Sequence, residues 1–190
     1  MTGNPAPGCS LEHIVLRLTA TPALAWGELQ GMPEALRQWR PGPGGWSAQE
    51  IVGHLVEADL RAFLGRIVLV REEPGALFER WDPDLVAAGR GDNGKDARDL
   101  IEEFARIRAV GVSTVRGLTA GDLAIAGRHP EAGDLTIGNL LAEWVAHDRA
   151  HLAQIGNVVR AAMLDGMGAA AGFGHAVAAR AWLDGERRGT

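Results

Sequence analysis

Proline and glycine divide the 190-residue chain into long segments of helix-forming residues, and this division most constrains the fold. The breaks fall at 1–8, 41–45, 73–75, 89–94 and 127–134. Between them no stretch alternates apolar and polar residues over the length of a strand, so the pattern predicts an all-α chain. At this length, and without a visible repeat, we expect one domain over residues 1–190.

Helix-start signals place the segments along the chain. Ser47-Ala-Gln-Glu50 fits a capping box, and Ser10 and Thr136 stand where N-caps are needed. We expect helices over about 10–31 (with Pro22 kinking it or opening a second segment), 47–72, 92 or 93 to 117, 136–164, and 173–183. These predict a four-helix bundle with a short extra C-terminal helix. The linker over 73–93 is long, and either crosses one end of the bundle or acts as a lid.

Composition excludes several classes of function. The net charge of -5 argues against nucleic-acid binding, which needs a basic face. No apolar run approaches the ~20 residues of a membrane span, so no membrane association is expected. The first residues lack the pattern of a signal peptide, so we expect a cytoplasmic protein. The single cysteine, Cys9, excludes an internal disulfide framework and a cysteine-based zinc knuckle.

Two histidines, His147 and His151, stand four residues apart in the predicted fourth helix. At about 100° per residue they differ by only about 40° around the helix, so they share one face. That face also carries Trp144 and Ile155, which places both imidazoles in the apolar stripe. A shared divalent metal ion suits such a pair. The alternative is two core histidines satisfied by hydrogen bonds, and the pair alone does not decide between them.

A third histidine, His54, lies in the predicted second helix beside small residues such as Ala58, Ala62 and Gly65. Small residues there let another helix or a ligand approach closely. The remaining histidines have weaker contexts, at a helix start, in a Gly/Pro loop and near the C-terminus: His13, His129 and His175.

Two segments carry a family resemblance. Trp46-Ser-Ala-Gln-Glu-Ile-Val-Gly-His54-Leu and the stretch from Leu135 to Ile155, with its His147-Asp-Arg-Ala-His151, resemble two bundle helices of the DinB-like (YfiT-like) proteins. This is the damage-inducible bundle family, not the DNA polymerase of the same name. The resemblance implies a four-helix bundle that holds one divalent metal ion through three histidines, which map to His54, His147 and His151. The tail after about Gly166 extends beyond it.

The resemblance also leads to expectations about chemistry. Three histidine ligands leave positions open on the ion, as in catalytic zinc sites. We expect zinc or nickel, with manganese or iron as alternatives, and a small-molecule substrate. The reaction is then of the thiol-dependent transferase or isomerase type, with a low-molecular-weight thiol, or a hydrolysis. Two other classes stay open: a non-catalytic metal-binding stress-response bundle, and an interaction module without metal.

Two acidic residues near the histidines, Asp148 and Glu57, each have two possible roles. Asp148 either orients a ligand or forms a buried ion pair with an arginine. Glu57, one turn from His54, is a candidate to hydrogen-bond and orient a metal-binding histidine, or to act as a general base. Glu50 is explained by the capping box, and Gln154 is close enough to His151 to contact a ligand.

The second helix is apolar on more than one side, with Val52, Val56 and Phe63 towards one and Ile51 and Leu69 towards another. A helix that is apolar this far round is buried on both sides. We therefore expect a homodimer, in which a partner subunit covers the second side. The alternative is that loops or the C-terminal helix of the same chain cover it.

Overall fold

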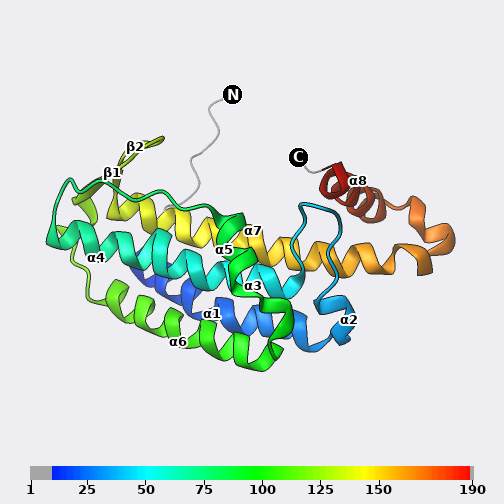
Figure 1. Cartoon of the computed structure of the whole chain (residues 1–190). Coiled ribbons are helices and arrows are strands. Elements are labelled where there is room, and N and C mark those ends of the chain that lie inside the picture. Colours follow the sequence, from blue (N-terminus) through cyan, green and yellow to red (C-terminus); the bar gives the residue numbers. More distant parts are fainter. Residues whose placement is uncertain (1–9, 189–190) are drawn as a thin grey trace.

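The computed structural model describes residues 10–188, in which four long helical rods pack side by side (Figure 1). The rods are α1 (Leu11–Gln30), the α3–α4 rod, α6 (Ala97–Arg116) and α7 (Ile137–Met163). The α3–α4 rod joins α3 (Ala48–Ala58) to α4 (Gly65–Glu72) through a π-helical segment, Asp59–Leu64. Both α1 and α3 pack against α6 and α7. The predicted four-helix bundle is therefore confirmed.

The predicted N-caps begin three of the rods. Ser47 accepts a hydrogen bond from the backbone N–H of Glu50, whose carboxylate in turn accepts from the backbone N–H of Ser47. Thr136 forms the same reciprocal pair with Asn139. Ser10 accepts from the backbone of α1. Each cap satisfies backbone donors that have no partner inside the helix.

Two helix expectations need correction. Pro22 lies within α1 but does not end it, because the helix continues from Leu11 to Gln30. The third long helix begins later than expected, after Asp96, whose carboxylate accepts from the backbone N–H groups of the first helical turn. The expected start instead forms a separate 3₁₀ turn, Asp92–Gly94.

The linker after α4 runs along the side of the bundle. Figure 1 shows that α4 and α6 run in the same direction, so the chain must return along the bundle between them. On the way it forms α5 (Pro83–Arg90), which crosses α3 and packs against it. Gly53 of α3 permits this approach, because a Cβ there would lie 1.8 Å from a carboxylate oxygen of Asp92. The linker thus packs on the side of α3 that carries Gly53 and Glu57.

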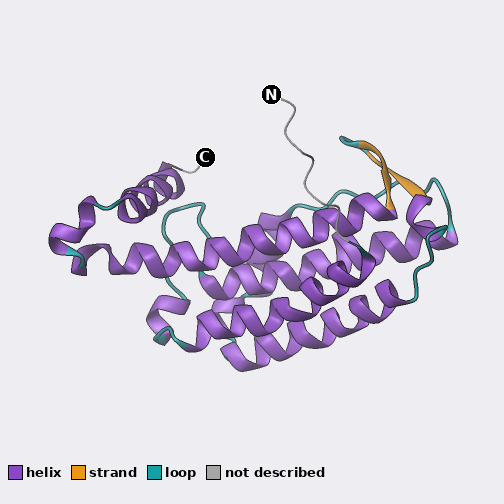
Figure 2. Cartoon of the chain, turned by 180° about the vertical axis from the view of Figure 1, so that it is seen from behind, coloured by secondary structure: helices purple, strands orange, loops and turns teal. Residues whose placement is uncertain are grey.

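The all-α class is confirmed, and a small antiparallel hairpin, which the sequence did not predict, accompanies the helices. Strands β1 (Ala126–His129) and β2 (Gly133–Thr136) pair directly before α7. Each strand has four residues, which is too short for an alternating pattern to stand out in the sequence. The hairpin lies at one end of the bundle, opposite the end that carries the C-terminal helix (Figure 2).

The C-terminal segment packs on the part of α7 that projects beyond the other rods (Figure 1). Here α8 (Gly174–Arg188) runs past the predicted end and packs against α7. Short helical pieces complete this end: α2 (Glu34–Arg37) and two 3₁₀ turns (Leu164–Gly166 and Gly168–Gly172). Leu164, Ala176 and Leu183 form a small apolar cluster here, against which Trp39 packs.

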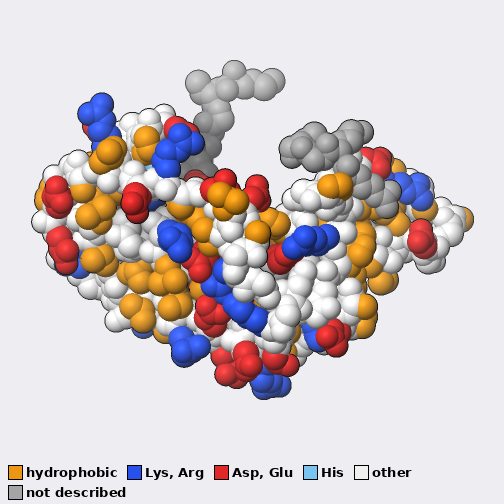
Figure 3. Space-filling view, viewed as in Figure 1, with side chains coloured by type: hydrophobic (Ala, Val, Ile, Leu, Met, Phe, Trp, Pro, Cys, Tyr) orange, Lys and Arg blue, Asp and Glu red, His pale blue; other side chains and the backbone are white. Residues whose placement is uncertain are grey.

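Acidic and basic side chains are interspersed over the face shown in Figure 3. Among the described residues, no helix is both long enough and apolar enough to cross a membrane.

Candidate metal centre

The structure brings together the three histidines singled out in the sequence. His54 comes from α3, and His147 and His151 come from α7. One ring nitrogen of each lies within 4.8 Å of the corresponding nitrogens of the other two. The Nε2 atoms of His54 and His147 are 3.0 Å apart. The packing of α3 on α7 therefore converts one helical pair and one distant histidine into a three-nitrogen cluster.

Burial keeps these imidazoles neutral. It lowers the pKa of His54 and of His147 to about 3, and the neighbouring histidines act in the same direction. Burial also lowers the pKa of His151, against the opposing effects of Gln154 and Asp148. Neutral imidazoles at pH 7 offer nitrogen lone pairs, which is the form that binds a metal ion.

The hydrogen bonds of the rings suit a shared cation. Nδ1 of His151 lies 2.9 Å from Oε1 of Gln154. With the proton of His151 on Nδ1 for this bond, its Nε2 is free to bind an ion. Nδ1 of His54 and Nδ1 of His147 are buried and have no hydrogen-bond partner among the described residues. A metal ion bound at the two facing Nε2 atoms would replace a single N–H···N contact with two nitrogen–metal bonds, so the donor set fits a divalent ion.

Aromatic rings from three segments surround the cluster. Trp46, just before α3, lies 4.6 Å from His54 and 6.2 Å from His151 between ring centroids. Trp81 of the linker stacks on His54 at 5.8 Å. Phe63 of the π-helical segment meets the His147 ring edge-on at 5.3 Å. These rings exclude water and lower the local dielectric, which strengthens electrostatic interactions with a bound ion.

A buried ion network adjoins the cluster. The guanidinium of Arg108 donates to both carboxylate oxygens of Asp59, at 2.7 and 2.8 Å, and to both of Asp148, at 2.5 and 2.8 Å. Trp144 Nε1 donates to Asp59, and Thr21 donates to Asp148. Burial favours neutral forms here and raises the pKa of Asp59 to about 6, while the two carboxylates raise the pKa of Arg108. Asp148 is thus the partner of a buried arginine, which is the ion-pair alternative expected from the sequence.

Glu57 is also held by arginines. Arg61 Nε lies 2.7 Å from one of its oxygens and Arg90 Nη1 lies 2.7 Å from the other. Burial opposes ionisation, but these two hydrogen bonds outweigh it and lower the pKa of Glu57. Because Arg90 belongs to α5, the pair fastens the linker to α3. A role of Glu57 as a general base stays a prediction.

The other sequence candidates lie outside the cluster. Glu50 completes the capping box and also pairs with Arg40. His13 contacts Ser10, and His129 accepts from backbone N–H groups in the hairpin. His175 lies beside Phe173 near the start of α8. Cys9 lies outside the described residues.

Sequence reasoning did not single out Arg108, Asp59 or Trp81. One signal for Arg108 was available, because it stands four residues after Phe104 and four before Val112 in the apolar stripe of α6. A charged residue inside such a stripe indicates a buried ion pair. No comparable signal marks Trp81, whose position depends on the path of the linker.

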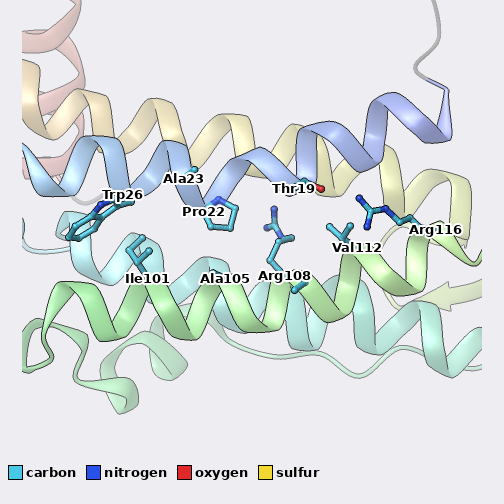
Figure 4. A pocket seen from close by; sticks show the side chains of 10 residues that line it. Thr19, Pro22, Ala23, Trp26, Ile101, Ala105, Arg108, Val112 and Arg116 are labelled. Carbon is cyan, nitrogen blue, oxygen red and sulfur yellow. The ribbon is translucent and has the colours of Figure 1, made fainter.

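Two cavities flank the bundle core. One of about 560 Å³ reaches His147 and is lined by side chains of the α3–α4 rod, α7 and the hairpin region. Another, of about 480 Å³, lies between α1 and α6 beside Arg108 (Figure 4). None of the three clustered histidines lines this second cavity. A small molecule in the first cavity would therefore lie against His147.

Known proteins share this fold and part of this sequence. A protein of Oceanobacillus iheyensis with the name "Putative metal-dependent hydrolase OB0782" is 24% identical over 112 residues, which are 59% of this chain. The chain spans 64% of that protein's length. A solved structure, YfiT from Bacillus subtilis, matches with a TM-score of 0.74 at 19% identity, over 83% of this chain and 91% of that one. It is described as a probable metal-dependent hydrolase with an unusual four-helix bundle topology.

The family model of the DinB superfamily matches residues 17–155. This range begins within α1 and ends within α7, so it contains the α3–α4 rod and α6 whole, most of α1 and α7, and the three histidines. The chain belongs to the DinB superfamily.

Proposed function

We propose that this protein is a metal-dependent enzyme that binds one divalent ion through His54, His147 and His151 and acts on a small molecule. The observation that carries the proposal is the convergence of three neutral imidazole nitrogens from two helices within 4.8 Å. The set contains three histidines and neither a carboxylate nor a cysteine among the described residues. Three neutral ligands leave the ion with its full positive charge and with open positions.

The bound ion would supply Lewis-acid chemistry: it polarises a substrate oxygen or stabilises a developing anion. Zinc and nickel suit an imidazole donor set, and manganese and iron are the alternatives. The residues of the chain orient the ligands and shield the ion. His151 is oriented by Gln154, while Trp46 and Trp81 exclude water on the His54 side. The reaction type best supported is hydrolysis, which the descriptions of both similar proteins name.

The pairing of the nearby carboxylates with arginines favours a second reaction type, in which no carboxylate acts as a base. Glu57, the candidate for a general base, and Asp148 are both held in ion pairs with arginines. A thiol that loses its proton on binding to the ion needs no protein base, because the metal lowers the thiol pKa. This supports transfer or isomerisation with a low-molecular-weight thiol as the alternative to hydrolysis.

Metal analysis of the purified protein tests the proposal. We expect about one divalent ion per chain in the wild type and loss of it in the triple variant His54→Ala/His147→Ala/His151→Ala. His129→Ala is the matched control, because His129 lies outside the cluster, and it should keep its metal. Activity is then assayed with a panel of esters and amides and with pairs of a thiol and an electrophile. Turnover of the esters or amides indicates hydrolysis, and turnover of the pairs indicates thiol transfer. In either case a chelator should abolish the activity and the ion should restore it. A triple variant with the metal content of the wild type would refute the site.

A further inference from the structure

The cavity that reaches His147 contains an arginine without an acidic partner. The cavity has a volume of about 560 Å³, within the range of small-molecule sites. Its lining comes from the π-helical segment, α4, the hairpin region and the first half of α7: Ala62, Phe63, Arg66, His129, Leu135, Asn139, Glu143 and His147 are among its residues. A ligand in this cavity can touch both the candidate metal ligand His147 and Arg66.

Arg66 differs from Arg90 and Arg108, the two arginines that form the bundle's buried ion pairs. Arg90 and Arg108 each pair with at least two carboxylates. Arg66 forms no ion pair within the described part of the chain, and its Nε is buried without a hydrogen-bond partner. Its guanidinium lies over the ring of Phe78, 5.0 Å from the centroid. No carboxylate of the described residues neutralises Arg66, and an anionic ligand in the cavity would do so.

Further hydrogen-bond donors line the same cavity. Nδ1 of His129 accepts the backbone N–H groups of Glu131 and Ala132, each at 3.2 Å. The proton of the neutral ring is therefore on Nε2, which is left to donate. Oδ1 of Asn139 accepts from the backbone N–H and the hydroxyl of Thr136. Its Nδ2 hydrogens have no partner among the described residues, so the cavity offers more donors than acceptors.

The geometry of the Arg66 guanidinium, rather than net charge, selects the type of anion. Glu143 is exposed and is the one acid among the residues that line the cavity. Arg66 and Glu143 nearly cancel each other, so the net positive charge at this site comes from the ion of the proposed function, and Arg66 contributes direction and shape. The planar guanidinium also matches the two oxygens of a carboxylate.

We propose that this cavity binds the carboxylate of a small-molecule substrate at Arg66 and so presents the reacting group of that substrate to the ion at His147. The inference rests on the proposed function, because it needs an ion at the histidine cluster. It adds a substrate class, a small carboxylic acid, and a residue that determines specificity.

The test uses the full chain loaded with cobalt, with visible absorption as the readout. Two sets of thiols are titrated: ω-mercaptocarboxylates from mercaptoacetate to 6-mercaptohexanoate, and uncharged mercaptoalcohols of matched length. As the sulfur binds the ion, the thiol proton is released to the buffer and the cobalt bands shift. We expect at least one mercaptocarboxylate to bind about 10-fold more tightly than its matched alcohol, as a charge-assisted bidentate contact gives.

Variants then assign the preference to Arg66. Arg66→Gln removes the cation and should abolish the preference for mercaptocarboxylates. Arg66→Lys keeps the charge but cannot donate two parallel hydrogen bonds to a carboxylate, so it should retain part of the preference. Arg71→Gln is the matched control: it lies on the same helix, removes the same charge and does not line the cavity. It should leave the preference unchanged. Butyrate should displace the bound mercaptocarboxylate at lower concentration than inorganic phosphate.

Three results would overturn the carboxylate site, and two others would overturn the metal site on which it depends. Equal affinity for charged and uncharged thiols, a preference that persists in Arg66→Gln, or stronger competition by phosphate overturns the carboxylate site while the metal centre stands. Cobalt content is measured separately for every sample. If the wild type binds no cobalt, or if no thiol shifts the bands of bound cobalt, the open metal site of the proposed function is wrong and the inference falls with it.

Discussion

Replacing Arg108 by methionine tests how the interior of this bundle is held together. Arg108 is 1% exposed and donates to Asp59, Asp148 and the backbone carbonyl of Leu18. Methionine has a similar length but neither charge nor donors. In Arg108→Met the carboxylates of Asp59 and Asp148, also 1% exposed each, therefore lose their counter-charge while they stay buried.

The expected loss is large on the scale of protein stability. Breaking a buried ion pair by removing one partner costs about 3–5 kcal/mol. A whole domain has about 5–15 kcal/mol of unfolding free energy, so the variant is marginal. At about 2–4 °C per kcal/mol for a chain of this size, the melting temperature should fall by roughly 6–20 °C. Because Asp148 lies between two clustered histidines in α7, metal affinity should fall as well.

Urea denaturation followed by circular dichroism measures the effect. Arg106→Met is the matched control, since Arg106 is exposed on the same helix, and it should change the unfolding free energy by less than about 0.5 kcal/mol. The triple variant Asp59→Leu/Arg108→Met/Asp148→Leu removes the stranded charges together with the cation. It should recover much of the loss, because a buried ion network replaced by apolar groups is often neutral or stabilising.

The loss in Arg108→Met should also depend on pH. Burial already raises the pKa of Asp59 to about 6 in the wild type, against the opposing effect of Arg108. Without Arg108 the folded-state pKa rises further above that of the unfolded chain. A carboxylate with a raised folded-state pKa destabilises the fold fully above that pKa, and the penalty shrinks as pH falls through it and the group becomes protonated. The deficit relative to wild type should therefore be larger at pH 8 than at pH 5. A deficit below 1 kcal/mol at pH 8, or one that grows towards pH 5, would refute this reasoning.

Four further outcomes are expected. Single alanine variants of the three clustered histidines should each lower the metal content well below one ion per chain, measured by elemental analysis. Gly53→Ala should cost about 1–3 kcal/mol in urea denaturation because its Cβ would meet Asp92, whereas Gly27→Ala, with open space around it, should stabilise α1 by up to about 1 kcal/mol. Addition of nickel should quench tryptophan fluorescence, and the double variant Trp46→Phe/Trp81→Phe should lose most of this quenching because these rings lie against the cluster. Light scattering should give twice the 20.1 kDa chain mass if the predicted homodimer forms, and a monomer mass would reject the dimer.

Local interactions explain why much of the fold could be predicted. The capping boxes at Ser47 and Thr136 depend on residues three positions apart, and the shared face of His147 and His151 follows from helix geometry alone. Within one helix the chain itself fixes which groups meet, so their spacing is enough. The resemblance to a known family supplied the third member, His54, which no local pattern connects to the pair.

The sequence by itself determined the helical segments, their caps and the candidate ligand set, whereas the tertiary structure decided what surrounds that set. His54 and His147 are separated by 93 positions, and Arg108 and Asp59 by 49. The linker runs along the bundle because α4 and α6 are parallel, and this places Trp81 on His54 and Arg90 on Glu57. Contacts of this kind depend on how the helices pack and on which buried charges must find a partner, and both are properties of the whole chain rather than of any short stretch of it.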